Sequence, residues 1–335
     1  MFASQRLLRS CLFLLLLPCI LPAALALSTV TPIFTVPGPL LPGSWFENLA
    51  VRPNGLILAT RGDAPEIWQI DPATGQGALL VSVSGAFNLT GIAEIASFRQ
   101  CSPQQPPSRP ETYVFGSSHI PAPFQVTPGS AKAWTLQFSP TTGLPTVSLL
   151  AALPDAGFIN GIASWGSRRV LLGDTEREVV YLMDVDTGVY TTPLTNMTGI
   201  NGVKVAPGYV YWANHLAQSL SRVRVDTSAI PNGPVEILAA DQSIDDFAIA
   251  VDRFGAGKAY IAAMYENKVV EVIVGAAPSL GPGAKRVVAE NLSGTGVGLT
   301  TAVVFGRRAE DSGLLYATVG QGGGNAAIVA IDPSE

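Results

Sequence analysis

The chain has 335 residues, of which 47% are hydrophobic and 13% are charged. This balance excludes a disordered chain, which needs high charge and few apolar residues, and a coiled coil, which needs many charged helix formers. The formal net charge of −5 leaves no basic surface for phosphates, so nucleic acid is not an expected partner. With 34 glycines and 26 prolines, the composition predicts short strands joined by turns.

The first segment of the chain is typical of a secretory signal peptide. Residues 1–10 carry Arg6 and Arg9 and no acid, and a short apolar run follows over residues 11–21. The small residues of Ala24-Leu25-Ala26 then resemble a cleavage site. The run is too short to span a bilayer comfortably. We therefore predict a signal peptide over 1–26, one domain over 27–335, a secretory location and no membrane association after cleavage.

Removal of this segment leaves a single cysteine in the mature protein. Cys11 and Cys19 are lost with the signal and only Cys101 remains, so no internal disulfide is possible and stability must come from the core. Secretion also makes asparagine glycosylation an expectation at three Asn-X-Ser/Thr triplets. Their asparagines are Asn88, Asn196 and Asn291.

Six similar units follow one another along the chain. Each contains a first strand that opens on a polar residue, a turn, and two further strand-like runs, and most units recur at intervals of about 40 to 45 residues. The third run often ends in a turn such as Asp71–Gly75, Ser139–Gly143 or Asp184–Gly188. A four-stranded unit with this period predicts an all-β fold, a six-bladed β-propeller. A pair of β-sandwiches is the alternative.

The last unit lacks a fourth strand because the chain ends at Glu335. The strand-like segment Thr29–Val36 can supply it, so that the mature N-terminus closes the ring and covers an exposed sheet edge.

Propeller geometry predicts which residues meet. The first strand of each blade lines the central channel, and the second strand runs antiparallel to it, so first-strand starts and second-strand ends share one face. The opening residues should form a ring: Glu47, Thr90, Asn160, Asn201, Asp246 and Thr300. Residues that follow second strands should surround this ring, among them Arg61, His119, His215 and Tyr265.

Four members of the ring resemble the metal-binding column of the senescence-marker-30/gluconolactonase propellers, within the TolB-like six-bladed group. The matching residues are Glu47, Asn160, Asn201 and Asp246. The resemblance implies a metal-dependent lactonase in which Asp246 is a ligand and the general base. Two carboxylates and two amide carbonyls suit a hard cation such as Ca²⁺. Asp246 departs from the pattern, because Asp245 precedes it and Phe247 follows it where these lactonases usually show Asp-Gly.

The phrase over Gly43–Gly55, together with Asn160-Gly161 and Asn201-Gly202, resembles the fungal hetero-Diels–Alderases of tropolone-sesquiterpenoid biosynthesis. That resemblance implies a cofactor-independent pericyclase. Its substrates would be a polyketide-derived, tropolone-type quinone methide and the alkene of a humulene-type sesquiterpene, joined as a dihydropyran in a meroterpenoid. Such chemistry needs an apolar site that holds two partners in a reactive pose and donors aimed at the oxygen that gains charge.

Under this interpretation the candidate catalytic groups are Arg61, His119, His215 and Asp246, and Asn160 and Asn201 orient the tropolone oxygens. The expected apolar wall consists of Phe46, Phe124, Phe158, Phe247, Met264 and Tyr265. Simpler explanations stay open. Glu47 and Asp246 could pair with Arg61 as a structural contact, and the Asn-Gly pairs could serve only to form turns.

Three classes of function remain. The pericyclase is the first, with no required cofactor, although Ca²⁺ at the channel is an option. The second is a metal-dependent lactonase or esterase, and the third is a non-catalytic secreted binding propeller. No Gly-X-Ser-X-Gly or His-Glu-X-X-His motif supports another hydrolase. We expect a monomer, because no exposed apolar helix or repeat feature indicates an oligomer.

Overall fold

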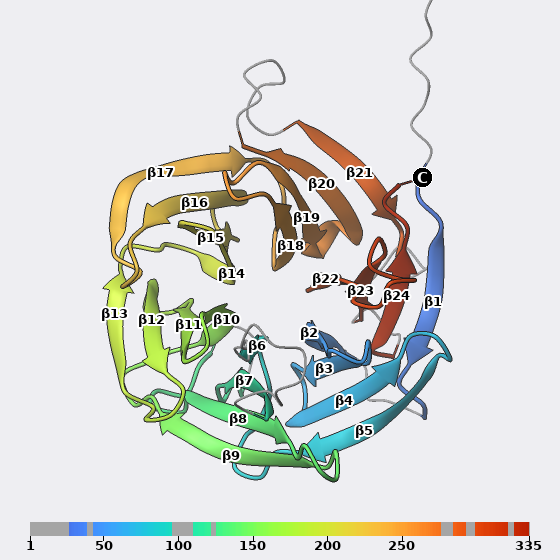
Figure 1. Cartoon of the computed structure of the whole chain (residues 1–335), viewed down its shortest axis with the longest axis horizontal. Coiled ribbons are helices and arrows are strands. Elements are labelled where there is room, and N and C mark those ends of the chain that lie inside the picture. The colour runs from blue at the N-terminus through green and yellow to red at the C-terminus, as the bar shows by residue number, and fades with distance from the viewer. Residues whose placement is uncertain are drawn as a thin grey trace, which may run out of the picture.

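The computed structural model describes residues 27–38, 43–95, 110–121, 125–275, 284–292, 299–320 and 325–334. Six antiparallel four-stranded sheets are arranged as blades around one axis (Figure 1). The predicted six-bladed β-propeller is confirmed. The predicted signal peptide, Cys101 and Phe124 lie outside the described residues. None of the helical structure in the described ranges is long and apolar enough to cross a membrane.

The first three blades follow one another in chain order from the innermost to the outermost strand. Blade one consists of β2 (Phe46–Val51), β3 (Ile57–Arg61), β4 (Glu66–Asp71) and β5 (Gln76–Ser82). Blade two consists of β6 (Ile92–Ile95), β7 (Glu111–Ser117), β8 (Lys132–Phe138) and β9 (Pro145–Ala152). Blade three consists of β10 (Ile159–Trp165), β11 (Arg169–Asp174), β12 (Val179–Asp184) and β13 (Tyr190–Leu194).

The other three blades complete the ring. Blade four consists of β14 (Ile200–Ala206), β15 (Tyr209–Asn214), β16 (Ser219–Val225) and β17 (Pro231–Ala239). Blade five consists of β18 (Phe247–Val251), β19 (Gly257–Ala263), β20 (Lys268–Val274) and β21 (Lys285–Glu290), with a 3₁₀ turn over Met264–Glu266. Blade six consists of β22 (Val303–Phe305), β23 (Leu315–Val319), β24 (Ala327–Ile331) and β1 (Val30–Thr35).

The core lies between neighbouring blades. The second strands are almost entirely buried, as in β3, whereas the outer strands such as β5 leave about every second side chain exposed. A strand with neighbours on both faces must be apolar throughout, which explains the continuous runs in the sequence. The predicted turns are present: the amide of Gly75 donates to the carbonyl of Asp71 at 2.9 Å, with Gly75 at a φ of 69°.

The N-terminal strand closes the ring, as predicted. β1 pairs antiparallel with β24, from Val30 opposite Ile331 to Thr35 opposite Ala327 (Figure 1). The ring of Phe34 packs against Trp68 of blade one, with 5.9 Å between the ring centroids. The segment therefore joins the sixth blade to the first as well as covering the edge of β24.

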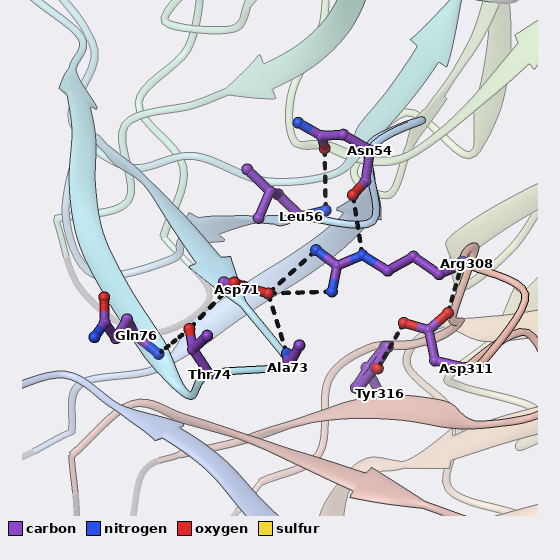
Figure 2. Close-up of polar contacts among 9 residues, drawn as sticks. All are labelled: Asn54, Leu56, Asp71, Ala73, Thr74, Gln76, Arg308, Asp311 and Tyr316. Atoms are coloured by element: carbon purple, nitrogen blue, oxygen red, sulfur yellow. Dashed lines mark hydrogen bonds and ion pairs between the residues drawn. The ribbon is translucent and has the colours of Figure 1, made fainter.

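A polar clasp joins blades six and one on the face opposite to the first-strand starts (Figure 2). Arg308 donates from Nε to the carbonyl of Asn54 at 3.0 Å and from Nη2 to Asp71 Oδ1 at 3.1 Å. Asp311 holds the backbone of Arg308 at 2.7 Å and accepts from the Tyr316 hydroxyl at 3.0 Å. The guanidinium thus bridges two segments separated by most of the chain.

Candidate functional site

The candidate site lies where the first strands begin and the second strands end, which we call the site face. The pairing register between the first and the second strand shifts in three blades. The shift comes directly after the first residue of β2, β10 and β14. Two residues then oppose one, as in a β-bulge, which turns the side chains at this point toward the ring axis. These irregularities contain Glu47, Asn160 and Asn201, as the predicted ring requires.

Backbone hydrogen bonds between neighbouring first strands show which residues occupy equivalent positions in different blades. The amide of Gly91 donates to Asn160 O at 2.9 Å, and the amide of Gly202 donates to Asp245 O at 2.9 Å. The amide of Asp246 in turn donates to Thr301 O at 3.1 Å. Asp245 therefore occupies the place of Asn160 and Asn201 in blade five, and Thr301 occupies it in blade six.

The predicted ring was thus wrong by one residue in two blades, where it placed Asp246 and Thr300. Both positions lie in doublets of like residues, Asp245-Asp246 and Thr300-Thr301, and a sequence pattern does not distinguish the members of a doublet. Asp246 instead occupies the second position, where the aligned residues of blades three and four are Gly161 and Gly202.

These glycines allow neighbouring first strands to approach closely. A Cβ on Gly161 would lie 2.2 Å from the carbonyl oxygen of Asn201, and one on Gly202 would lie 2.2 Å from Oδ1 of Asp246. Neither glycine has a positive φ. The Asn-Gly pairs therefore serve close packing around the axis, not turn formation.

Asp246 is buried at 2% exposure and accepts three kinds of hydrogen bond. The ammonium of Lys204 lies 2.6 Å from both carboxylate oxygens, and Nδ2 of Asn48 donates to Oδ2 at 2.9 Å. The amide of Phe247 donates to Oδ1 at 2.8 Å. The structural alternative in which Asp246 pairs with Arg61 is wrong, because Lys204 is its ion-pair partner.

Glu47 and Asp245 are the other two acids near the axis. Trp45 Nε1 donates to Glu47 Oε2 at 2.6 Å. Burial and the charge of Asp246 raise the pKa of Glu47 to about 7, and the bond from Trp45 only partly offsets them. Burial, followed by the charges of Glu47 and Asp246, also raises the pKa of Asp245, against a hydrogen bond with Asn201 and the charge of Lys204. Of these three acids, Asp246 alone forms an ion pair with an ammonium among the described residues.

The oxygens of this ring match the chemistry of a hard cation. With the corrected register, Glu47, Asp245, Asn160 and Asn201 provide two carboxylates and two amide carbonyls. Oδ1 of Asn201 is buried without a hydrogen-bond partner among the described residues, so it is available as a ligand. Across the part of the chain that is described, no three His, Cys, Asp or Glu side chains alone are grouped to hold a metal, so the amides would have to contribute.

Arg61 does not act as a free donor on the site face. Its guanidinium donates from Nε to Asp63 Oδ1 at 2.7 Å and from Nη1 to Glu66 Oε2 at 3.2 Å. Only 6% of the residue is exposed. Two carboxylates already hold its charge, so this geometry does not favour Arg61 as a donor to a substrate, and its catalytic role stays a prediction.

Both histidines follow second strands, as expected, and both are half-buried. His119 stacks on Phe87 with 3.9 Å between ring centroids, and its Nδ1 lies 2.8 Å from the hydroxyl of Thr127. Nδ1 of His215 lies 2.9 Å from the carbonyl of Gly199. A carbonyl only accepts, so this Nδ1 carries a proton, and in the tautomer with Nδ1 alone protonated Nε2 is an acceptor.

The expected apolar wall is divided by burial. Phe46 and Phe247 are completely buried between blades, so they lie behind the site face and not on it. Phe158 and Met264 are half-buried, whereas Tyr265 is 69% exposed.

Sequence reasoning missed three side chains near this face. Lys204 is a charged residue inside an otherwise apolar first strand, which was a usable signal. Phe87 and Leu216 are 59% and 64% exposed. Phe87 precedes the first strand of blade two much as Phe158 precedes that of blade three, and this repetition could have identified it.

The glycosylation predictions differ in outcome. A glycan must be attached to an asparagine on the surface, whereas Asn88 is 6% exposed and its Oδ1 accepts from the amide of Ser118 at 3.1 Å, so this position does not suit glycosylation. Asn196 and Asn291 are exposed, and glycosylation of these two residues stays a prediction.

Comparison with known proteins supports the second resemblance. No family model matches the chain. A protein from Phoma sp is 26% identical over 82% of this chain and 83% of its own length, and one from Sarocladium schorii is 25% identical over 82% and 75%. Both carry the name hetero-Diels-Alderase, with the assignment marked as provisional. The calcium-binding protein regucalcin from Agrobacterium tumefaciens has the same fold, with a TM-score of 0.55, 14% identity and coverage of 87% and 92%.

Proposed function

We propose that this protein is a hetero-Diels–Alderase that joins a tropolone-type quinone methide to the alkene of a humulene-type sesquiterpene. The observation that carries the proposal is the similarity to two proteins of that name over 82% of the chain. In the reaction, the two alkene carbons bond to the terminal carbon and the oxygen of the heterodiene. All atoms of both reactants are retained, so no co-reactant is needed.

The side chains of the site face support binding of two apolar reactants. Phe87, Leu216 and Tyr265 are exposed there, at first-strand entries and second-strand exits of three different blades. Apolar groups exposed on one face favour an apolar ligand, because binding removes them from water. Holding two reactants in a reactive geometry lowers the barrier by roughly 7–11 kcal/mol in favourable cases.

The two imidazoles provide polar contacts for the oxygens of such a ligand. His119 is held by Thr127 and by stacking on Phe87, which places a ring nitrogen beside an apolar surface. A donor fixed next to the heterodiene oxygen would stabilise the charge that this oxygen gains in the transition state. Nε2 of His215 would accept a hydrogen bond from a tropolone hydroxyl.

Metal-dependent hydrolysis of a cyclic ester is the second candidate, favoured by the four oxygen donors around Asn201. When bound, a divalent cation there would polarise the ester carbonyl. Asp246 is a poor general base in this arrangement, because Lys204 and Asn48 already engage its oxygens.

The test is an assay of adduct formation with a quinone-methide precursor and a humulene-type alkene. The pericyclase predicts a rate above the uncatalysed background and one dominant stereoisomer, both retained with a chelator present. Absence of any rate enhancement would contradict the proposal, and hydrolysis of a lactone that a chelator abolishes would favour the second candidate.

Variants on opposite faces give the matched control for this assay. Tyr265 is 69% exposed on the site face, and Phe254 is 71% exposed in the turn between β18 and β19 on the other face. We expect Tyr265→Ala to slow adduct formation by about tenfold, equivalent to about 1.4 kcal/mol, and Phe254→Ala to leave it unchanged. Unchanged activity in Tyr265→Ala and Phe87→Ala together would indicate that the site face is not used.

A further inference from the structure

Asp246 places an additional charge at a position where the aligned residues of blades three and four are glycine. Its carboxylate is 2% exposed and lies so near β14 that a Cβ on Gly202 would contact it at 2.2 Å. Glu47 and Asp245 are close enough for each to affect the charge of the others. Two buried carboxylates, those of Asp245 and Asp246, and the half-buried one of Glu47 would be strongly unfavourable together without a compensating charge.

Lys204 supplies the compensating charge from within the chain. It follows Gly202 by two residues on β14, and its Nζ lies 2.6 Å from both oxygens of Asp246 and 5.5 Å from the centre of the Phe247 ring. Among the described residues, the other polar side chains that contact these acids are neutral: Asn48, Asn201 and Trp45. The ammonium is therefore the one cation that contacts this group among the described residues.

A second observation, an unpaired buried acceptor, points to a ligand position. Asn201 is more than nine-tenths buried, lies in hydrogen-bond contact with Asp245, and leaves its Oδ1 without a partner. An unpaired buried carbonyl costs free energy unless a donor or a cation reaches it. Oδ1 of Asn201 and the carboxylates of Glu47 and Asp245 are the oxygen ligands that a cation would use next to the Lys204–Asp246 pair.

We propose that Lys204 is an internal counter-ion that competes with a divalent cation for the carboxylates around the ring axis. Two positive charges near each other in a buried environment repel strongly, so the ammonium weakens binding of Ca²⁺ to Glu47, Asn201 and Asp245. Removing the ammonium frees Asp246 and leaves a net negative site. The inference concerns cation binding and does not depend on which reaction the protein catalyses.

The test measures Ca²⁺ binding by calorimetry and by the shift of the melting temperature, without any activity assay. We expect Lys204→Met to bind Ca²⁺ at least about tenfold more tightly than the wild type, equivalent to about 1.4 kcal/mol, and to melt at a higher temperature when Ca²⁺ is added. Lys258→Met is the matched control, because Lys258 also pairs with a buried acid, Glu271, at 2.9 Å. This pair lies in blade five but away from the first-strand start that contains Asp245 and Asp246. That control should respond to Ca²⁺ like the wild type.

A double variant separates charge competition from other effects. Lys204→Met/Asp246→Asn restores the net charge of the wild-type site, so we expect its Ca²⁺ affinity to return toward the wild-type value. Equal affinity in Lys204→Met and the wild type would overturn the proposal, as would a double variant that keeps the full gain. If Lys204→Met alone does not fold, we expect millimolar Ca²⁺ to restore folding where Na⁺ at equal ionic strength does not, and failure of that rescue would also overturn it.

Discussion

Two glutamates with little exposure to solvent, the buried Glu271 and the half-buried Glu47, show how contacts determine the behaviour of a carboxyl group. Glu271 is 6% exposed and accepts from Lys258 at 2.9 Å and Tyr260 at 3.0 Å. Burial alone would raise the pKa of Glu271, but these bonds and Arg286 lower it. Glu47 has one donor, Trp45, and an acid as its neighbour, so its pKa moves in the opposite direction, to about 7. The two groups therefore affect stability in different ranges of pH.

The first prediction concerns Glu47→Gln, measured with a chelator present. Between the ordinary pKa of 4.5 and about 7, the folded protein keeps a proton on Glu47 that the unfolded chain has released. Raising the pH through this range therefore destabilises the wild type, and the variant should lose less of its free energy of unfolding over the same range. Urea unfolding at several pH values provides the measurement.

Glu271→Gln is the control for this experiment. Because the pKa of Glu271 is lowered, its contribution to stability is present above 4.5 and is lost as the pH falls below that value. The control variant should thus change the dependence of the free energy of unfolding on pH only below pH 4.5. Identical slopes for Glu47→Gln and the wild type between 4.5 and about 7 would contradict the assignment.

At the scale of elements, spacing and register were predictable to different degrees. Blade boundaries followed from the repeated strands and turns, because each blade must alternate buried strands with turn residues. The position of each side chain at the start of the first strand did not follow, because a β-bulge there adds a residue. The doublets Asp245-Asp246 and Thr300-Thr301 were therefore assigned one residue away from their place, and only the bonds between blades resolve them.

The second prediction tests the close approach of first strands. In Gly161→Ala the new Cβ would lie 2.2 Å from the carbonyl oxygen of Asn201 and 2.5 Å from the amide nitrogen of Val203, both backbone atoms. We expect a loss of about 1–3 kcal/mol in the free energy of unfolding, measured in urea. In Gly313→Ala nothing lies within 4 Å of the new Cβ, so this control should be neutral or stabilising by about 0.4–1 kcal/mol. Equal effects in the two variants would refute the packing argument.

At the scale of the whole molecule, ring closure combines β1, the Phe34–Trp68 contact and the Arg308 clasp. The sequence predicted the closing strand, because only three strands were found for the sixth blade and the mature N-terminus contains a strand-like segment that belongs to no other blade. It did not predict the partners of Arg308 or Asp246. Those pairs join residues far apart in the chain, and which cation reaches a given acid depends on the three-dimensional arrangement. Asp246 illustrates this, because its partner is Lys204 and not Arg61.

The third prediction compares two arginines that pair with equivalent turn aspartates. Arg308 bridges blades six and one through Asp71, whereas Arg168 pairs with Asp184 and Asp186 within blade three and is 61% exposed. Arg308→Ala should reduce the free energy of unfolding by about 1.5–3 kcal/mol, because it removes bonds from a charged group that hold the ring closed. Arg168→Ala should cost no more than about 1 kcal/mol. Similar losses of the free energy of unfolding in the two variants, measured with a denaturant, would show that the Arg308 clasp does not contribute specifically to closing the ring.

The central claim is that the site face binds the two apolar reactants and their product. Hydrogen–deuterium exchange with and without the dihydropyran product tests it most directly, because the method reports the location of binding without any variant. We predict slower exchange over residues 84–91, 117–121, 214–218 and 263–267, and no change over the opposite turns at 52–56 and 252–256. Protection confined to those opposite turns, or no protection at saturating product, would contradict the account.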